Sequence, residues 1–230
     1  MIRCSVCGHE NDDLAVLCVS CKSYLQSKVD TLDLFQTFWT LIISPRTAFR
    51  RIALSRHKNY IFLVSSLLGI ALAYSVLWFK NLGPSFPNLI ILLLSGLLAG
   101  PLLGIAFVFL FSAVMILLDR LLGGRATLRT TFGVVAYSAM PIVLSLVLVF
   151  PIEVAIFGID LFDNNPSPLV IKPFIYITLL GFDTLAVLWA WLLLIEGAIV
   201  ANGFTRARSW ELAGLVFLVT VAGVYGLRLL

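Results

Sequence analysis

Charged side chains are scarce in this chain of 230 residues. Asp, Glu, Lys and Arg together make up 12% of it, while the hydrophobic residues (AVILMFWYC) make up 60%. A soluble domain carries about 25% charged residues, so there is too little charge here to cover a water-soluble globule. Together with a mean hydropathy of +1.04, this excludes an ordinary soluble enzyme, a disordered chain and a soluble nucleic-acid-binding domain. It predicts an integral membrane protein.

Histidine and the familiar catalytic motifs are also lacking. The only two histidines, His9 and His57, come before the first long apolar run. The apolar part therefore has no histidine for a Ser-His-Asp triad or for a histidine-bound metal. There is no P-loop, no G-x-G-x-x-G after a strand, no G-x-S-x-G and no H-E-x-x-H in the sequence. We expect that the protein is not an enzyme and has no catalytic residue.

Long uncharged apolar runs, by contrast, fill most of the chain. A helix needs about 20 apolar residues to cross the hydrocarbon core of a bilayer, and backbone groups in lipid must be satisfied within the helix. Five runs meet this length, over about residues 60–79, 89–118, 134–157, 174–200 and 210–229. They predict an all-α fold in which residues 60–230 form a five-helix transmembrane bundle.

The distribution of Lys and Arg predicts the orientation of these spans. The successive segments outside the spans carry eight, one, three, one, two and one basic residues. This alternation is the pattern of the positive-inside rule with the N-terminus in the cytoplasm and the C-terminus outside. The first residues, MIRCSVCGHENDDL, lack the apolar core of a signal peptide. We therefore expect a multi-pass protein of the cell membrane whose first span directs its own insertion.

All four cysteines lie within the first 21 residues, as two C-x2-C pairs separated by ten residues: Cys4, Cys7, Cys18 and Cys21. Two such knuckles can supply the four thiolates of a structural zinc site. Gly8 suits the turn after the first pair, whereas the second pair is followed by Lys22. Two disulfides are the alternative, but a cytoplasmic segment stays reduced. We predict a zinc ribbon over residues 1–28 with one structural zinc ion, and no ligand role for His9.

The predicted ribbon carries no excess of positive charge. Residues 1–28 contain three basic and three acidic side chains, whereas nucleic-acid binding depends on a basic excess. We therefore expect no nucleic-acid partner. A small folded module of this kind either contacts a cytosolic or membrane protein or serves only for stability.

Residues 29–59 contain no apolar run long enough to span a membrane. Leu32, Phe35, Phe38, Trp39 and Ile42 recur at helical spacing, and Ser44-Pro45 resembles the start of a second helix. We predict two amphipathic helices at the cytoplasmic interface of the bilayer. The side chains expected to meet lipid headgroups are Arg46, Arg50 and Arg51. Packing of these helices on the bundle is an alternative, and both can hold at once.

Several of these segments resemble the Yip family, five-span proteins first met as partners of Rab-type GTPases. Residues 43–52, ISPRTAFRRI, are similar to its P-x-x-x-F-x-x-I entry. The pair Gly123-Gly124 leading to AYSAMP over residues 136–141 resembles its third span, and the run from Trp189 to Gly203 its fourth. With the span count, the resemblance covers about residues 34–230. An N-terminal zinc ribbon resembles the prokaryotic members, whereas eukaryotic members have long polar tails. The resemblance implies a membrane-organising or adaptor role and transfers no catalytic residue.

Ionisable groups within the predicted spans are the remaining candidates for function, because they are costly in lipid. They are Asp183, Glu153 and Glu196, with Tyr137 and Ser138 deeper on the cytoplasmic side. Asp183 and Glu153 could approach each other in the outer half of the bundle. One interpretation is a proton- or cation-linked cavity. The other is structural, with Asp183 protonated or hydrogen-bonded and Glu196 paired with a nearby arginine.

The second span carries three glycines at intervals of four: Gly96, Gly100 and Gly104. Small residues at this spacing allow another helix to approach closely. That helix belongs either to the same chain or to a second copy in a homo-oligomer.

These observations favour a non-enzymatic membrane adaptor or membrane-organising protein whose ribbon contacts a protein partner. The alternative is a small transporter, channel or lipid-handling protein that uses Asp183 and its polar neighbours.

Overall fold

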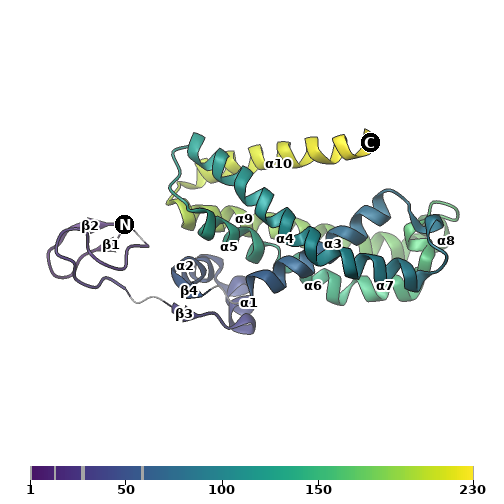
Figure 1. The fold of residues 1–230 in the computed structure, drawn as a ribbon, viewed down its shortest axis with the longest axis horizontal. Helices are drawn as coiled ribbons and strands as arrows, with labels where there is room; N and C mark the ends of the chain where they lie inside the picture. The colour runs from purple at the N-terminus through teal and green to yellow at the C-terminus, as the bar shows by residue number, and fades with distance from the viewer. Residues whose placement is uncertain (1, 13, 27–28, 58–59, 230) are drawn as a thin grey trace.

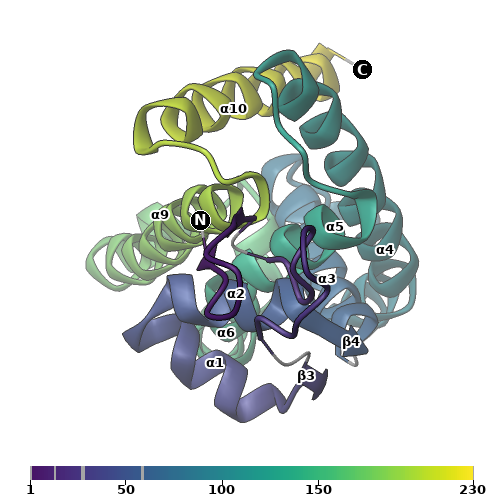
Figure 2. The same cartoon turned by 90° about the vertical axis from the view of Figure 1, so that its left-hand side faces the viewer.

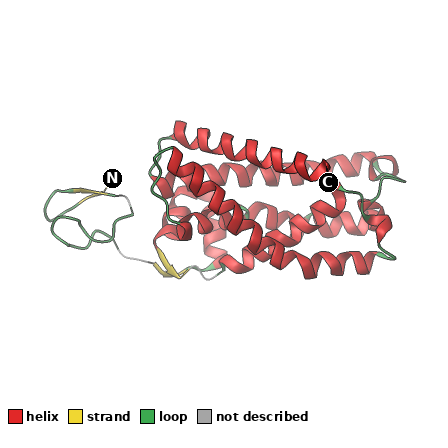
Figure 3. Ribbon diagram, turned by 45° about the horizontal axis from the view of Figure 1, so that its top comes forward, coloured by secondary structure: helices red, strands yellow, loops and turns green. Residues whose placement is uncertain are grey.

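The computed structural model describes residues 2–12, 14–26, 29–57 and 60–229, without the side chains of residues 29–30 and 219–229. A small N-terminal module lies beyond one end of an elongated helical bundle (Figure 1). The module holds two short antiparallel strands, β1 (Ile2–Arg3) and β2 (Glu10–Asn11), with Ile2 opposite Asn11. Figure 3 shows that helix dominates the remainder, with connecting loops gathered at the two ends of the bundle.

Two short helices connect the module to the bundle. α1 (Leu34–Ile43) begins after Asp33, whose carboxylate accepts a hydrogen bond from the Gln36 N–H at 2.7 Å. α2 (Pro45–Leu54) begins after Ser44, where proline fits because the first turn of a helix needs no N–H donor. The strands β3 (Val29–Thr31) and β4 (Ser55–His57) pair in parallel and flank the two helices in the sequence.

α2 packs into the bundle. Its buried residues Ala48, Phe49 and Ile52 belong to the main apolar core. Phe49 lies against Gly197, where an added Cβ would come within 3.1 Å of the ring. α1, in contrast, leaves Phe35, Trp39 and Ile43 exposed. The alternative that these helices pack on the bundle therefore holds for α2. In α1, an apolar face is exposed and no described residue covers it.

Four segments are long and apolar enough to cross a membrane. They are α3 (Ile61–Phe79), α4 (Leu89–Leu121), the segment Leu128–Phe162, and α9 (Pro173–Asn202). Short 3-10 and α-helical turns, η1 (Gly83–Ser85) and α8 (Pro168–Ile171), lie in the connections between them. Four of the five predicted spans fall on these segments.

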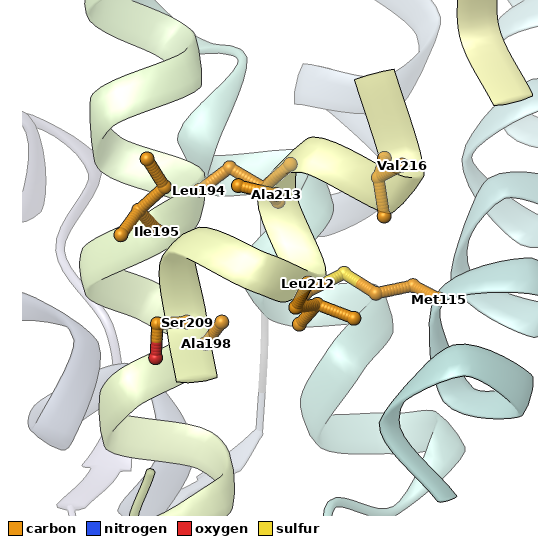
Figure 4. A pocket seen from close by; sticks show the side chains of 8 residues that line it. All are labelled: Met115, Leu194, Ile195, Ala198, Ser209, Leu212, Ala213 and Val216. Carbon is orange, nitrogen blue, oxygen red and sulfur yellow. The ribbon is translucent and has the colours of Figure 1, made fainter. Parts of the chain in front are cut away.

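The fifth predicted span falls on α10 (Arg206–Leu229), which is helical over 24 residues. Its first half packs against α9 and α4 through apolar side chains that include Leu212, Ala213 and Val216 (Figure 4). This seam leaves no room for a water molecule. Figure 2 shows α10 on the side of the bundle away from α1. The side chains after residue 218 lie outside the described residues, so the fifth span stays a prediction.

The third span is divided into several helices. It consists of α5 (Leu128–Ser138), α6 (Met140–Leu148), α7 (Phe150–Phe157) and the 3-10 turn η2 (Gly158–Phe162). Pro141 and Pro151 stand at the starts of α6 and α7. Proline has no N–H and its ring displaces the carbonyl four residues earlier, which interrupts a continuous helix at each site.

The three glycines of α4 lie against α3 of the same chain. A Cβ added to Gly104 would lie 2.0 Å from the Ser65 carbonyl oxygen, and one on Gly96 would lie 2.2 Å from the Tyr74 ring. Gly69 of α3 faces the same seam, because a Cβ there would lie 2.0 Å from the Gly100 carbonyl oxygen. The close approach predicted from the glycine spacing is therefore made within one chain.

We expect Gly104→Ala to destabilise the protein by about 1–3 kcal/mol, because the new methyl group overlaps backbone atoms that cannot rotate away. The measurement is the thermal unfolding midpoint of the purified protein in detergent. Gly181→Ala is the matched control, since nothing lies within 4 Å of a Cβ built there. Equal midpoints for the two variants would show that α3 and α4 do not depend on this contact.

Candidate functional site

The two cysteine knuckles fold in the same way. In each, the residue after the second cysteine donates its N–H to the carbonyl of the first cysteine: Gly8 to Cys4 and Lys22 to Cys18, both at 3.0 Å. Gly8 and Lys22 both have a positive φ, 71° and 60°. Glycine adopts this conformation freely, whereas lysine does so at a cost. The second knuckle thus makes the same turn with a less suitable residue.

The four cysteine sulfurs converge on one point. All lie within 4.8 Å of one another, with 3.5 Å between the sulfurs of Cys7 and Cys18 and 3.6 Å between those of Cys4 and Cys21. A tetrahedral ion with metal–sulfur bonds of about 2.3 Å places its ligands about 3.8 Å apart. All four are free thiols in the structure. The cluster fits a metal ion bound by four thiolates.

Hydrogen-bond donors surround the sulfurs. The Ser23 hydroxyl lies 3.0 Å from both Cys4 Sγ and Cys21 Sγ, and Asn11 Nδ2 donates to Cys18 Sγ at 3.6 Å. The contact with Ser23, followed by the backbone N–H groups of Cys7 and Val6, lowers the pKa of the Cys4 thiol to about 6. Such donors stabilise the thiolate form that a metal requires.

Neither Ser23 nor Asn11 stood out in the sequence. Ser23 could have been found from its position. It lies two residues after Cys21, just as His9 lies two residues after Cys7. The backbone carbonyls of both residues accept the N–H of the first cysteine of their knuckle, at 2.9 Å. The imidazole of His9 is not part of the sulfur cluster.

Each of the three arginines predicted at the membrane surface has a partner within the chain. Arg46 Nε donates to Glu196 Oε2 at 2.6 Å, which raises the pKa of the guanidinium. Arg50 and Arg51 donate to the side-chain oxygens of Gln26 and Gln36. These contacts tie α2 to α9, to the N-terminal module and to α1.

Glu196 thus belongs to the end of the bundle nearest the N-terminal module. Besides Arg46, it lies 3.9 Å from Arg206 Nη2 at the start of α10. One carboxylate therefore joins α2, α9 and α10. The contact with Arg206 is the arginine pairing that the structural interpretation of the sequence expected for Glu196.

Asp183 and Glu153 do come together, between α9 and α7. Their carboxyl groups lie close enough to interact electrostatically. The Ser145 hydroxyl of α6 donates a hydrogen bond to Asp183 Oδ1. Glu153 is buried and Asp183 half-buried. Ser145 was missed in the sequence, although a hydroxyl at the centre of an apolar run is a usable signal.

Tyr137 and Ser138 are both buried in α5. The Ser138 hydroxyl donates to the Val134 carbonyl in its own helix at 2.6 Å. The Tyr137 hydroxyl is buried and has no hydrogen-bond partner among the described residues. These two side chains therefore serve the packing of α5 in this structure.

A further buried acid was missed. Asp119 is 1% exposed in the last turn of α4, directly after the uncharged run of the second predicted span. The side chain of Asn202, the last residue of α9, faces it. Neither carboxylate oxygen of Asp119 has a hydrogen-bond partner among the described residues. Asn202 Oδ1 accepts the Ala126 N–H at 2.9 Å, so Asn202 ties the end of α9 to the connection between α4 and α5.

The long apolar helices and the bundle they form define a membrane protein. The sequence model of the Yip1-domain family matches residues 39–227 of the chain. The chain therefore belongs to the Yip1-domain family, which confirms the resemblance found in the sequence. Comparison with curated proteins and with solved structures gave no match.

We expect the purified protein to carry one metal ion per chain, because four thiolates at tetrahedral spacing form a complete ligand set. Cys4→Ser/Cys7→Ser should remove it, as measured by elemental analysis against protein concentration. Ser5→Ala/Ser20→Ala is the control, since it changes the same knuckles at exposed positions. Full metal content in the double cysteine variant would contradict the assignment of these ligands.

Proposed function

We propose that this protein is a non-enzymatic membrane adaptor whose N-terminal ribbon contacts a soluble protein partner while the helical bundle anchors it. The observation that carries the proposal is the apolar surface of the ribbon. Val6 and Val19, one in each knuckle, are 73% and 68% exposed, and Tyr24 is 80% exposed. Exposed apolar groups on a small module that stands beyond the bundle (Figure 1) suit a protein contact.

Zinc is the metal proposed for the ribbon. Soft thiolate ligands favour zinc over the hard cations that bind oxygen. Four protein ligands close the coordination shell, so the ion holds the two knuckles together and leaves no position for a substrate. The ribbon residues then present Val6 and Val19 on a rigid surface.

The proposed topology places the ribbon in the cytoplasm and the C-terminus outside, in the cell membrane of a prokaryote. The connection between α4 and α5 and the start of α10 lie at the end of the bundle nearest the ribbon (Figure 1). They carry Arg125, Arg206 and Arg208, whereas the connections after α3 and before α9, at the opposite end, carry Lys80 and Lys172. This imbalance supports a cytoplasmic ribbon end. The five-span count belongs to the same proposal.

α1 is proposed to lie at the cytoplasmic surface of the bilayer. It exposes Phe35, Trp39 and Ile43, which no described residue covers. Aromatic and apolar side chains on a helix next to spanning segments suit the interface between headgroups and acyl chains. The neighbouring arginines of α2 can reach headgroups while they keep their protein partners.

The adaptor proposal predicts that a soluble partner is lost when the exposed tips of the knuckles become polar. The measurement is a crosslinking pull-down from native membranes with wild type and Val6→Ser/Val19→Ser at equal abundance. The variant keeps all four cysteines, so its metal content should not change. We expect a soluble protein in the wild-type sample and at least a fivefold loss in the variant.

Ser5→Ala/Ser20→Ala again serves as the control, since it alters neighbouring exposed positions without removing apolar surface. Identical partner profiles for wild type and Val6→Ser/Val19→Ser would reject the ribbon as a recruiting module.

A second candidate function rests on the Glu153–Asp183 pair. Two carboxyl groups that interact electrostatically within an apolar bundle, one of them hydrogen-bonded by Ser145, form an arrangement suited to binding a proton or small cation. Under this proposal the protein is a small transporter, channel or lipid-handling protein. The pair joins α7 and α9, so a change in its protonation would act on both helices.

This second candidate predicts that Asp183→Asn folds normally but changes ion flux, because the amide cannot exchange a proton. Flux is measured as the pH change inside liposomes that contain the full-length protein. Glu211→Gln, an exposed change at the start of α10, is the control for loss of one negative charge. Flux equal to wild type in well-folded Asp183→Asn would eliminate the transport role.

A further inference from the structure

A partly open pocket lies at the end of the bundle opposite the ribbon. It is formed where the end of α3, the segment after η2 and the start of α9 meet. Its volume is about 180 Å³, which corresponds to about six water molecules at the volume they occupy in the liquid. That space is sufficient for a small organic group.

Aromatic side chains form much of its wall: Trp78, Phe79 and Tyr176. Trp78 Nε1 donates a hydrogen bond to the Tyr176 hydroxyl at 3.1 Å. This bond joins α3 to α9 across 98 residues of sequence and holds both rings in place. Aromatic faces gathered around a cavity attract organic cations.

An acid lines the same pocket. Asp163 Oδ1 accepts the backbone N–H groups of Asn164 and Asn165, at 2.6 and 3.2 Å. These bonds fix the carboxylate, and among the described residues no donor is assigned to its second oxygen. A fixed negative charge beside aromatic rings adds to the attraction for a cation.

The backbone at the pocket is held in an unusual conformation. Asn81, which lines it, has a positive φ of 52°. Non-glycine residues rarely adopt this region, although asparagine tolerates it better than most. Such positions often occur at binding sites, where the surrounding structure maintains them.

Apolar residues next to the pocket mark the lipid side. Val170 of α8 and Phe174 at the start of α9 are 77% and 83% exposed, and Leu169 is exposed as well. Lys172, also exposed, comes one helical turn before Tyr176. A phospholipid with an amine headgroup would match these features. Its ammonium group suits Asp163, its phosphate suits Lys172, and its acyl chains suit the apolar rim.

We infer that the pocket binds an alkylammonium group, supplied by the headgroup of an amine phospholipid such as phosphatidylethanolamine. The ammonium group lies among Trp78, Phe79 and Tyr176 and faces Asp163, while the acyl chains run along α8 and α9. This inference concerns the end of the molecule away from the ribbon and does not depend on the adaptor proposal.

The test is native mass spectrometry of the full chain in detergent, titrated with phosphatidylethanolamine or phosphatidylglycerol. We expect wild type to bind the former about tenfold more tightly, because only that headgroup carries an ammonium ion. Asp163→Asn should lose this tenfold preference and bind the two lipids with about equal affinity. Asp160→Asn, which removes an equal charge from η2 outside the pocket lining, should retain it.

A competition with soluble ethanolamine distinguishes the two sources of the ammonium group. Displacement of the lipid by millimolar ethanolamine supports the same site. Binding of ethanolamine without any preference among lipids rejects the lipid as the source. Equal affinity of wild type for both lipids together with no binding of ethanolamine overturns the inference, and this comparison requires no variant to fold.

Discussion

The lack of water in the hydrocarbon core is the constraint on which the rest of this structure depends. Every backbone N–H and C=O in that layer must find its partner within the chain, so the apolar segments form helices. Lipid offers no hydrophobic force to press these helices together. Close contact has to supply the attraction instead, and the glycines of α4 provide it by letting α3 approach to backbone distance.

Polar side chains then join helices and connecting segments that lie far apart in the sequence. Glu196 holds α2 and α10 at the ribbon end, and Asn202 anchors the connection after α4. Asp183 and Glu153 meet between α9 and α7, and Trp78 and Tyr176 meet at the far end. The ribbon adds a further kind of site, in which four cysteine sulfurs lie close enough together to hold one metal ion.

Much of this could be predicted because it depends on local sequence. The spacing of the cysteines led to the sulfur cluster, and apolar length led to four of the spans. The family followed from short ordered motifs and is confirmed by the match over residues 39–227. Asp119 was not predicted as a buried acid, because the uncharged run ends one residue before it, although the helix continues to Leu121. The sequence suggested a nearby arginine for Glu196, which Arg206 provides, but Arg46 was not foreseen because it lies 150 residues away in the chain.

The sequence by itself determined the membrane class, the cluster of four cysteines and the glycine spacing, because each arises from residues close together in the chain. Only the tertiary structure decided which polar groups meet. Ser145 and Asp183 are 38 residues apart, and Arg46 and Glu196 are 150 apart. Such pairs depend on how the helices rotate and tilt against one another. Helices that are apolar all round carry little record of this in their sequence, since lipid accepts every face alike.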